Sequence, residues 1–137
     1  VMPARKPELS ARGAELIAQR LAAAGHTITH DWTRHVLQHQ PAGIPDSAMT
    51  YAEASSYAFL DERGVERAEV LWLLAPAAGK TEGGWCEFGM ATALGRVTVV
   101  SGATHNIFRT RARFSYPTHE AALEWLCERD DEAEAAQ

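Results

Sequence analysis

Glu87 is the residue whose type and position most directly indicate chemistry in this chain. It follows a short apolar run over residues 70–74 and a loop with Gly83 and Gly84, and it opens a segment of helical spacing that stops at Gly95. A carboxylate in the first turn of a helix lies near unpaired backbone N–H groups and the positive end of the helix dipole, which favour its ionised form. The pattern indicates a nucleophile or a cation-stabilising group. It also suits an ordinary first-turn acid that only stabilises its helix.

Asp61 is the second candidate acid. Residues 48–67 are rich in alanine and predict a helix. Positions spaced by three and four share one face of it, and they are Tyr51, Ala54, Ala58, Asp61 and Val65. An acid on such a face is costly to bury unless it is paired or employed in a site. The opposite stripe through Ala52, Phe59 and Leu60 is an alternative buried face, which would leave Asp61 at the rim of the core.

Other reactive side chains give weaker indications. Cys86, one residue before Glu87, is a competing nucleophile, because a thiolate is also favoured in the first turn of a helix. His30, His35 and His39 suggest a metal site, but no cysteine or acid at a matching spacing supports one, so no metal or other cofactor is expected.

Helices and strands alternate along the chain, and this alternation should position these residues. The spacing predicts helices over residues 7–24, 48–67 and 85–94, and a last helix capped by Thr118, with a polar tail that frays after residue 128. Strands are predicted over residues 26–32, 70–74, 97–100 and 113–116. The strand at 26–32 would bring Trp32 to the same sheet edge as Glu87.

This order predicts an α/β fold, a three-layer α/β/α sandwich with a mainly parallel sheet of the flavodoxin or Rossmann-like kind. Such a sheet normally begins with a strand before the first helix, and that strand appears to be missing from the chain. Ligands of parallel sheets bind where strands end, and Gly83 and Gly84 would let a ligand approach the backbone closely there.

Composition sets limits on the class of protein. The 137 residues are 46% hydrophobic and 23% charged, as expected for one globular domain over residues 1–137. A net charge of -5 without any block of Lys or Arg argues against nucleic acid polymers and anionic membranes as partners. Two cysteines, no apolar leader and no long apolar span predict a cytoplasmic location.

Several blocks in order resemble one known family. They are Arg67-Ala-Glu-Val-Leu-Trp-Leu-Leu, Gly83-Gly-Trp-Cys-Glu-Phe-Gly-Met-Ala-Thr-Ala-Leu-Gly95, Val97-Thr-Val-Val, Asn106-Ile-Phe and Ala122-Leu-Glu-Trp-Leu126. This order is similar to that of the nucleoside 2-deoxyribosyltransferase-like superfamily, which includes N-glycosidases of nucleoside 5′-monophosphates. The likeness covers the last half of the chain well, and the first helix and second strand more loosely.

The resemblance implies an enzyme that acts on the N-glycosidic bond of a nucleoside or nucleotide. Glu87 matches the family's catalytic glutamate, which attacks the anomeric carbon, and Asp61 falls where the family carries an aspartate that assists at the base or sugar. The family also implies a homodimer or higher homo-oligomer, in which Asn106 reaches the adjoining subunit's pocket.

Further residues are candidates for substrate binding. Trp32, Tyr51, Tyr57 and Trp85 have rings that can stack on a base, although each also suits core or rim packing. Arg109 and Arg111 have guanidinium groups that suit a 5′-phosphate, or they are solvated loop charges.

The sequence offers two other interpretations, and a third does not fit it. One is a nucleotide-binding or sensing domain of the same fold without turnover, and another is a cysteine-dependent enzyme that uses Cys86. A phosphate-loop reading of Gly79-Lys80-Thr81 fails, because Leu74 stands where that motif needs glycine.

Overall fold

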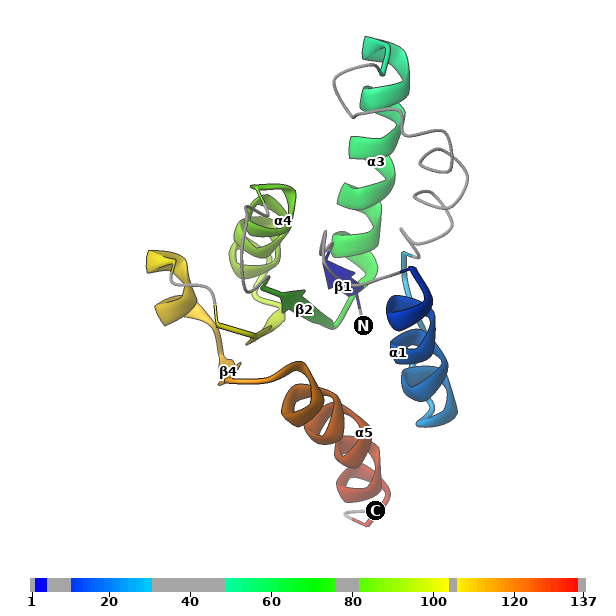
Figure 1. Cartoon of the computed structure of the whole chain (residues 1–137), viewed down its shortest axis with the longest axis vertical. Coiled ribbons are helices and arrows are strands. Elements are labelled where there is room, and N and C mark those ends of the chain that lie inside the picture. Colours follow the sequence, from blue (N-terminus) through cyan, green and yellow to red (C-terminus); the bar gives the residue numbers. More distant parts are fainter. Residues whose placement is uncertain (1, 5–10, 31–48, 76–81, 104–105, 136–137) are drawn as a thin grey trace.

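A parallel β-sheet forms the centre of the protein. The computed structural model describes residues 2–4, 11–30, 49–75, 82–103 and 106–135. Within these residues the strands are β1 (Met2–Ala4), β2 (Val70–Leu74), β3 (Val97–Ser101) and β4 (Phe114–Tyr116), paired in parallel in the order β1-β2-β3-β4. The helices are α1 (Ala11–Ala23), α3 (Tyr51–Arg67), α4 (Glu82–Ala93) and α5 (His119–Ala135), with a short 3-10 helix, η2 (Ile107–Arg111) (Figure 1).

Helices pack on both faces of the sheet because successive strand residues point to opposite sides. On one face, Leu71, Leu73 and Val100 pack with side chains of α3 and α4. On the other face, the neighbouring strand residues Trp72 and Val99 pack with side chains of α1 and α5. The architecture is therefore α/β with a parallel sheet, consistent with a Rossmann-like fold.

The central strands form where the sequence predicts them. β2 and β3 are apolar almost throughout, and every residue of each after the first is buried, as expected for strands covered on both faces. β4 was predicted as a short edge strand and is confirmed. The strand that appeared to be missing is present, since β1 lies at the edge of the sheet beside β2.

The predicted strand at 26–32 is not formed over residues 26–30, and residues 31 and 32 lie outside the described part. Side chains of this segment bind neighbouring helices instead. His26 Nε2 hydrogen bonds with the carbonyl oxygen of Leu126 at 2.7 Å, and Thr29 Oγ1 donates to the carbonyl oxygen of Gly64 at 3.0 Å. These bonds hold the segment between α5 and α3.

Helix boundaries differ from the expected ones in three places. α4 begins at Glu82, so Gly83 and Gly84 belong to the helix and not to a preceding loop. α5 continues to Ala135, beyond the point at which the polar tail was expected to fray, and η2 forms a helical turn between β3 and β4 that was not predicted. α1 is described from residue 11, so the predicted start at residue 7 falls outside the described residues.

α3 contacts the core only at its C-terminal end. Thr50 caps it with its side chain and forms a capping box with Glu53. Its buried residues are Gly64 and Val65, whereas Phe59 and Leu60 are exposed, so the alternative stripe is not the buried one. The N-terminal half of α3 extends well beyond α4 (Figure 1).

Candidate functional site

Glu87 is a buried carboxylate on a helix that packs against the centre of the sheet. Because α4 begins at Glu82, Glu87 lies in the second turn and not in the first. Its side chain is only 8% exposed and its Oε2 atom is shielded from solvent, while the next residue, Phe88, is part of the core. Burying a carboxylate is costly, so its burial distinguishes Glu87 from an ordinary acid that only stabilises the first turn of a helix. Glu82, in the first turn, is exposed.

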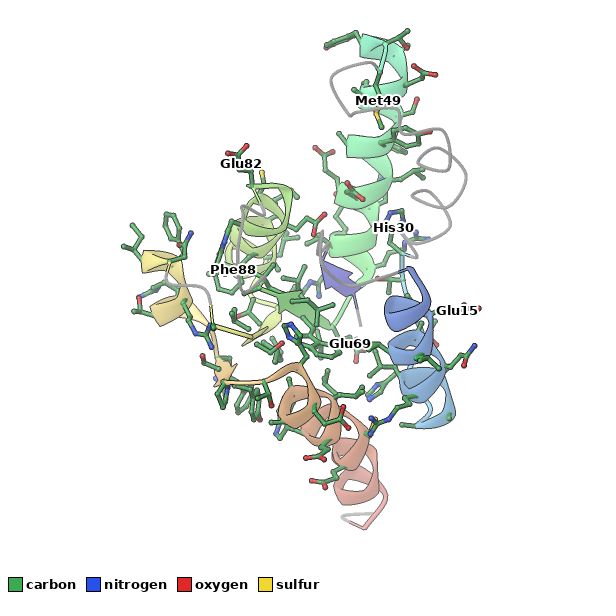
Figure 2. The ribbon with its side chains drawn as sticks, in the orientation of Figure 1. Glu15, His30, Met49, Glu69, Glu82 and Phe88 are labelled. Atoms are coloured by element: carbon green, nitrogen blue, oxygen red, sulfur yellow. The ribbon has the colours of Figure 1, made fainter. Side chains whose placement is uncertain are left out.

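Asp61 lies on α3 and makes an ion pair with a histidine. Its Oδ1 atom is 3.0 Å from Nε2 of His30, the last described residue after α1. The Asp61 side chain is 38% exposed and that of His30 is 16% exposed. His30 lies against α3 in Figure 2. Asp61 is thus half-buried and paired with an imidazole.

Asp61 and Glu87 lie on two helices that pack against each other. α3 leads into β2 and α4 leads into β3, so both helices end at the amino edge of the sheet and pack side by side. Their ends are tied together, because Arg96 Nη2 donates to the carbonyl oxygen of Glu66 at 2.6 Å. Each acid comes six residues before the last residue of its helix, which is about 9 Å along the axis. The two carboxylates are therefore carried by adjacent, packed helices.

The other predicted residues of α4 lie beside Glu87. Gly84 is buried and Gly83 is exposed, both inside the helix. Trp85 is half-buried, and its ring meets that of Phe88 edge to face, with 5.4 Å between centroids. Trp85 thus packs against the core, which is the alternative to base stacking that the sequence left open for this ring.

One predicted stacking residue lies far from Asp61 along α3, and another falls outside the described residues. Tyr51 is 90% exposed and begins α3, ten residues before Asp61, which is about 15 Å along the helix. Trp32 lies outside the described residues, as do His35 and His39. Tyr57 is half-buried.

The residues predicted after β3 hold their own loop together. Asn106 caps η2, because its Oδ1 atom accepts from the Phe108 N–H at 2.9 Å. Arg109 donates from Nη1 to the Gly102 carbonyl at 2.6 Å, from Nη2 to the Tyr116 carbonyl at 2.9 Å and from Nε to Ser115 at 2.9 Å. Arg111 is exposed. Arg109 braces β4 against the end of β3, and Arg111 is the more accessible cation.

A buried hydrogen-bonded chain at the carboxyl ends of the strands was missed by sequence reasoning. Trp72 Nε1 donates to Ser101 Oγ at 2.8 Å, and Ser101 Oγ lies 2.7 Å from Nδ1 of His119, the first residue of α5. Ser101 is fully buried. The available signal was Ser101 itself, a serine directly after the predicted strand at 97–100. The pairing of His30 with Asp61 was also missed.

Cys86 and Cys127 are free thiols, Cys86 exposed and Cys127 half-buried. In the described part of the chain, no group of three or more His, Cys, Asp and Glu side chains is placed to hold a metal ion. Among the same residues, no helix combines the length and apolar character needed to cross a membrane.

Comparison with known proteins gives no match to a protein family, to a curated protein or to a solved structure.

Proposed function

We propose that this protein is an enzyme that breaks the N-glycosidic bond of a nucleoside or nucleotide, with Glu87 as the nucleophile. The observation that carries the proposal is the burial of Glu87 on α4, the helix that follows the central strand β2 and packs against the helix that carries Asp61. The resemblance of residues 83–95 to the nucleoside 2-deoxyribosyltransferase-like superfamily supports the same role. We also assign the fold to the three-layer sandwich of flavodoxin-like proteins.

The reaction uses the two acids differently. Departure of the base develops positive charge at C1′ of the sugar, and the Glu87 carboxylate traps it as a glycosyl ester. Water or a second base then attacks C1′ and releases the carboxylate. The choice of acceptor separates hydrolysis from transfer. Asp61, the second acid, lies on α3 and assists the departing base. Arg111 is a candidate for a 5′-phosphate, and the enzyme needs no cofactor.

The test replaces Glu87 with Gln and with Ala and follows free base after incubation with nucleosides and nucleoside 5′-monophosphates. We expect both variants to lose at least about 10³-fold in rate, because the nucleophile itself is removed. Glu82→Gln is the matched control, because it removes an exposed acid from the same helix. Mass spectrometry of the quenched wild type should find the sugar attached to the peptide that contains Glu87.

Two results would redirect the assignment. Full turnover by Glu87→Gln would remove Glu87 from the mechanism, and loss of turnover in Cys86→Ser would instead favour the thiol, which is exposed one residue away. Nucleotide binding without release of base by the wild type would favour the alternative of a non-catalytic binding domain.

A further inference from the structure

The segment that follows α1 is fixed to α3 at two points one helical turn apart. Thr29 Oγ1 donates to the Gly64 carbonyl at 3.0 Å, and His30 Nε2 lies 3.0 Å from Asp61 Oδ1. Two anchors three residues apart on α3 determine where the imidazole of His30 lies. The ring is better shielded from solvent than its partner, since the exposed fractions are 16% for His30 and 38% for Asp61.

This geometry determines which ring nitrogen carries a proton in neutral His30. An ionised carboxylate accepts hydrogen bonds only, so Nε2 holds its proton toward Asp61. Nδ1 is then the nitrogen that gains and loses a proton. Asp61 is the only polar partner of the ring among the described residues. A carboxylate that orients a histidine in this way is a common device in proton transfer.

We propose that His30, and not Asp61, transfers the proton to the departing base, and that Asp61 is a positioning residue that acts through His30. The inference rests on the proposed function, and it names the proton donor of that reaction. Asp61 orients the ring, because its carboxylate lies on the Nε2 side.

The proposed reaction has two stages. The C1′–N bond breaks, its electron pair stays on the base nitrogen, and that nitrogen takes the proton from His30 Nδ1. At the same time a Glu87 oxygen bonds to C1′. Water then attacks C1′, the Glu87–C1′ bond breaks, and the proton of water passes to His30 Nδ1. The products are free base and free sugar, with Glu87 ionised and His30 protonated as at the start.

In the described part of the chain, α3 and α4 carry other charged residues besides Asp61. On α3, Glu62 is exposed, and Arg63 pairs with Glu66 at 2.6 Å. On α4, the charged residues are Glu82 and Glu87. The proposed proton donor is the imidazolium form, so the rate of base release should depend on pH.

The decisive variant is His30→Gln in the full-length chain. The glutamine amide can still donate to Asp61 from the position of Nε2, but it has no nitrogen that titrates in place of Nδ1. We expect base release to fall by about 10²- to 10⁴-fold and its pH dependence over the imidazole range to disappear. His30→Asn is the second variant. Its amide nitrogen takes the position of Nδ1, and the side chain no longer donates to Asp61.

Asp61→Ala provides the opposite comparison. If His30 transfers the proton, this variant is slower but keeps the pH dependence, and the double variant with His30→Gln is no slower than His30→Gln alone, since the two residues act as one unit. The proposal would be overturned if folded His30→Gln kept the wild-type rate and pH dependence while Asp61→Ala lost both. The proton donor would then be Asp61.

Nitrogen-15 NMR of the wild-type imidazoles tests the geometry without any turnover. We expect His30 to carry its proton on Nε2 in the neutral form, and Asp61→Ala to weaken this preference. A proton on Nδ1 would overturn the proposal. If wild type releases no base from any substrate, the proposed function fails. If Glu87→Gln abolishes release and His30→Gln does not, only the assignment of His30 fails.

Discussion

Gly102 occupies a conformation and a space that suit glycine alone. Its φ angle is +101°, in the region that side chains rarely adopt, and a Cβ atom there would overlap the carbonyl oxygen of Ala75 and press on the His119 ring. The close approach joins the carboxyl ends of β2 and β3 to the start of α5. Gly102 thus sets the spacing at the edge where ligands of parallel sheets bind.

We predict that Gly102→Ala destabilises the protein by about 2 to 4 kcal/mol, because the backbone strain and the overlap act together. Urea unfolding followed by circular dichroism measures the change. Gly89→Ala is the matched control, since Gly89 lies in the interior of α4 with nothing within 4 Å of its Cβ position, and it should gain about 0.5 to 1 kcal/mol. A Gly102→Ala variant as stable as wild type would contradict the close approach.

The sequence pattern marks single residues as candidates, and their roles stay predictions. Glu87 and Asp61 were selected because each is an acid in an apolar or helical context. The partner of Asp61 was not predictable, because His30 is 31 residues away and the contact depends on how residues 26–30 cross to α3. Ser101 and His119 were missed for the same reason, since the bond between them joins β3 to α5.

At the scale of elements, α1 and α5 are joined by an ion pair beside a thiol. Arg20 Nη1 lies 2.6 Å from Glu120 Oε1. Burial raises the pKa of the Cys127 thiol, Arg20 lowers it in part, and the carboxylates of Glu120 and Glu128 raise it again. The protonated thiol is thus favoured in the folded state. This contribution to stability is complete below the ordinary pKa of the thiol and is lost as pH rises through the folded value.

We predict that Arg20→Gln raises the pKa of Cys127 further, because it removes the cation that favours the thiolate. In a Cys86→Ser background, Cys127 is the remaining cysteine, so the rate of alkylation by iodoacetamide against pH reports its thiolate. The curve for Arg20→Gln should shift to higher pH. Glu15→Gln, which changes an exposed residue of α1, should leave the curve in place. A shift to lower pH in Arg20→Gln would contradict the expected sign.

Elements were predictable where one signal dominates. The apolar runs of β2 and β3 match the strands within one residue. The start of α4 was misplaced because Gly83 and Gly84 indicate a loop in sequence, whereas packing of Gly84 against its surroundings outweighs their low helix propensity. The β-branched run at 26–32 indicated a strand, but polar bonds to α3 and α5 hold residues 26–30 outside the sheet.

For the whole molecule, the surface after β3 bears on association with a second copy. Ile107 and Phe108 are neighbours on η2 and are 79% and 55% exposed, next to Asn106. Large exposed apolar side chains side by side are common in interfaces. The prediction that Asn106 reaches an adjoining subunit concerns this same loop.

We predict a homodimer or larger homo-oligomer at micromolar concentration, measured by sedimentation velocity. Ile107→Asp should shift the population toward monomer and lower base release with it. Leu94→Asp is the control, because Leu94 is also exposed, at 49%, but lies just after the C-terminal end of α4. A strictly monomeric wild type with full turnover would contradict a shared site.

The pairing of β1 with β2 has a consequence for how the sheet opens. Met2 pairs with Leu71, so this pairing closes a loop of about 70 residues, whereas Val70 with Val97 closes one of about 27. The longer loop costs about 0.8 kcal/mol more in chain entropy, and β1 has three residues over which to recover it. Partial unfolding should therefore begin with release of β1 while β2, α4 and β3 stay together. Glu87, on α4, would then stay within the unit that unfolds last, whereas Asp61 lies on α3, outside it.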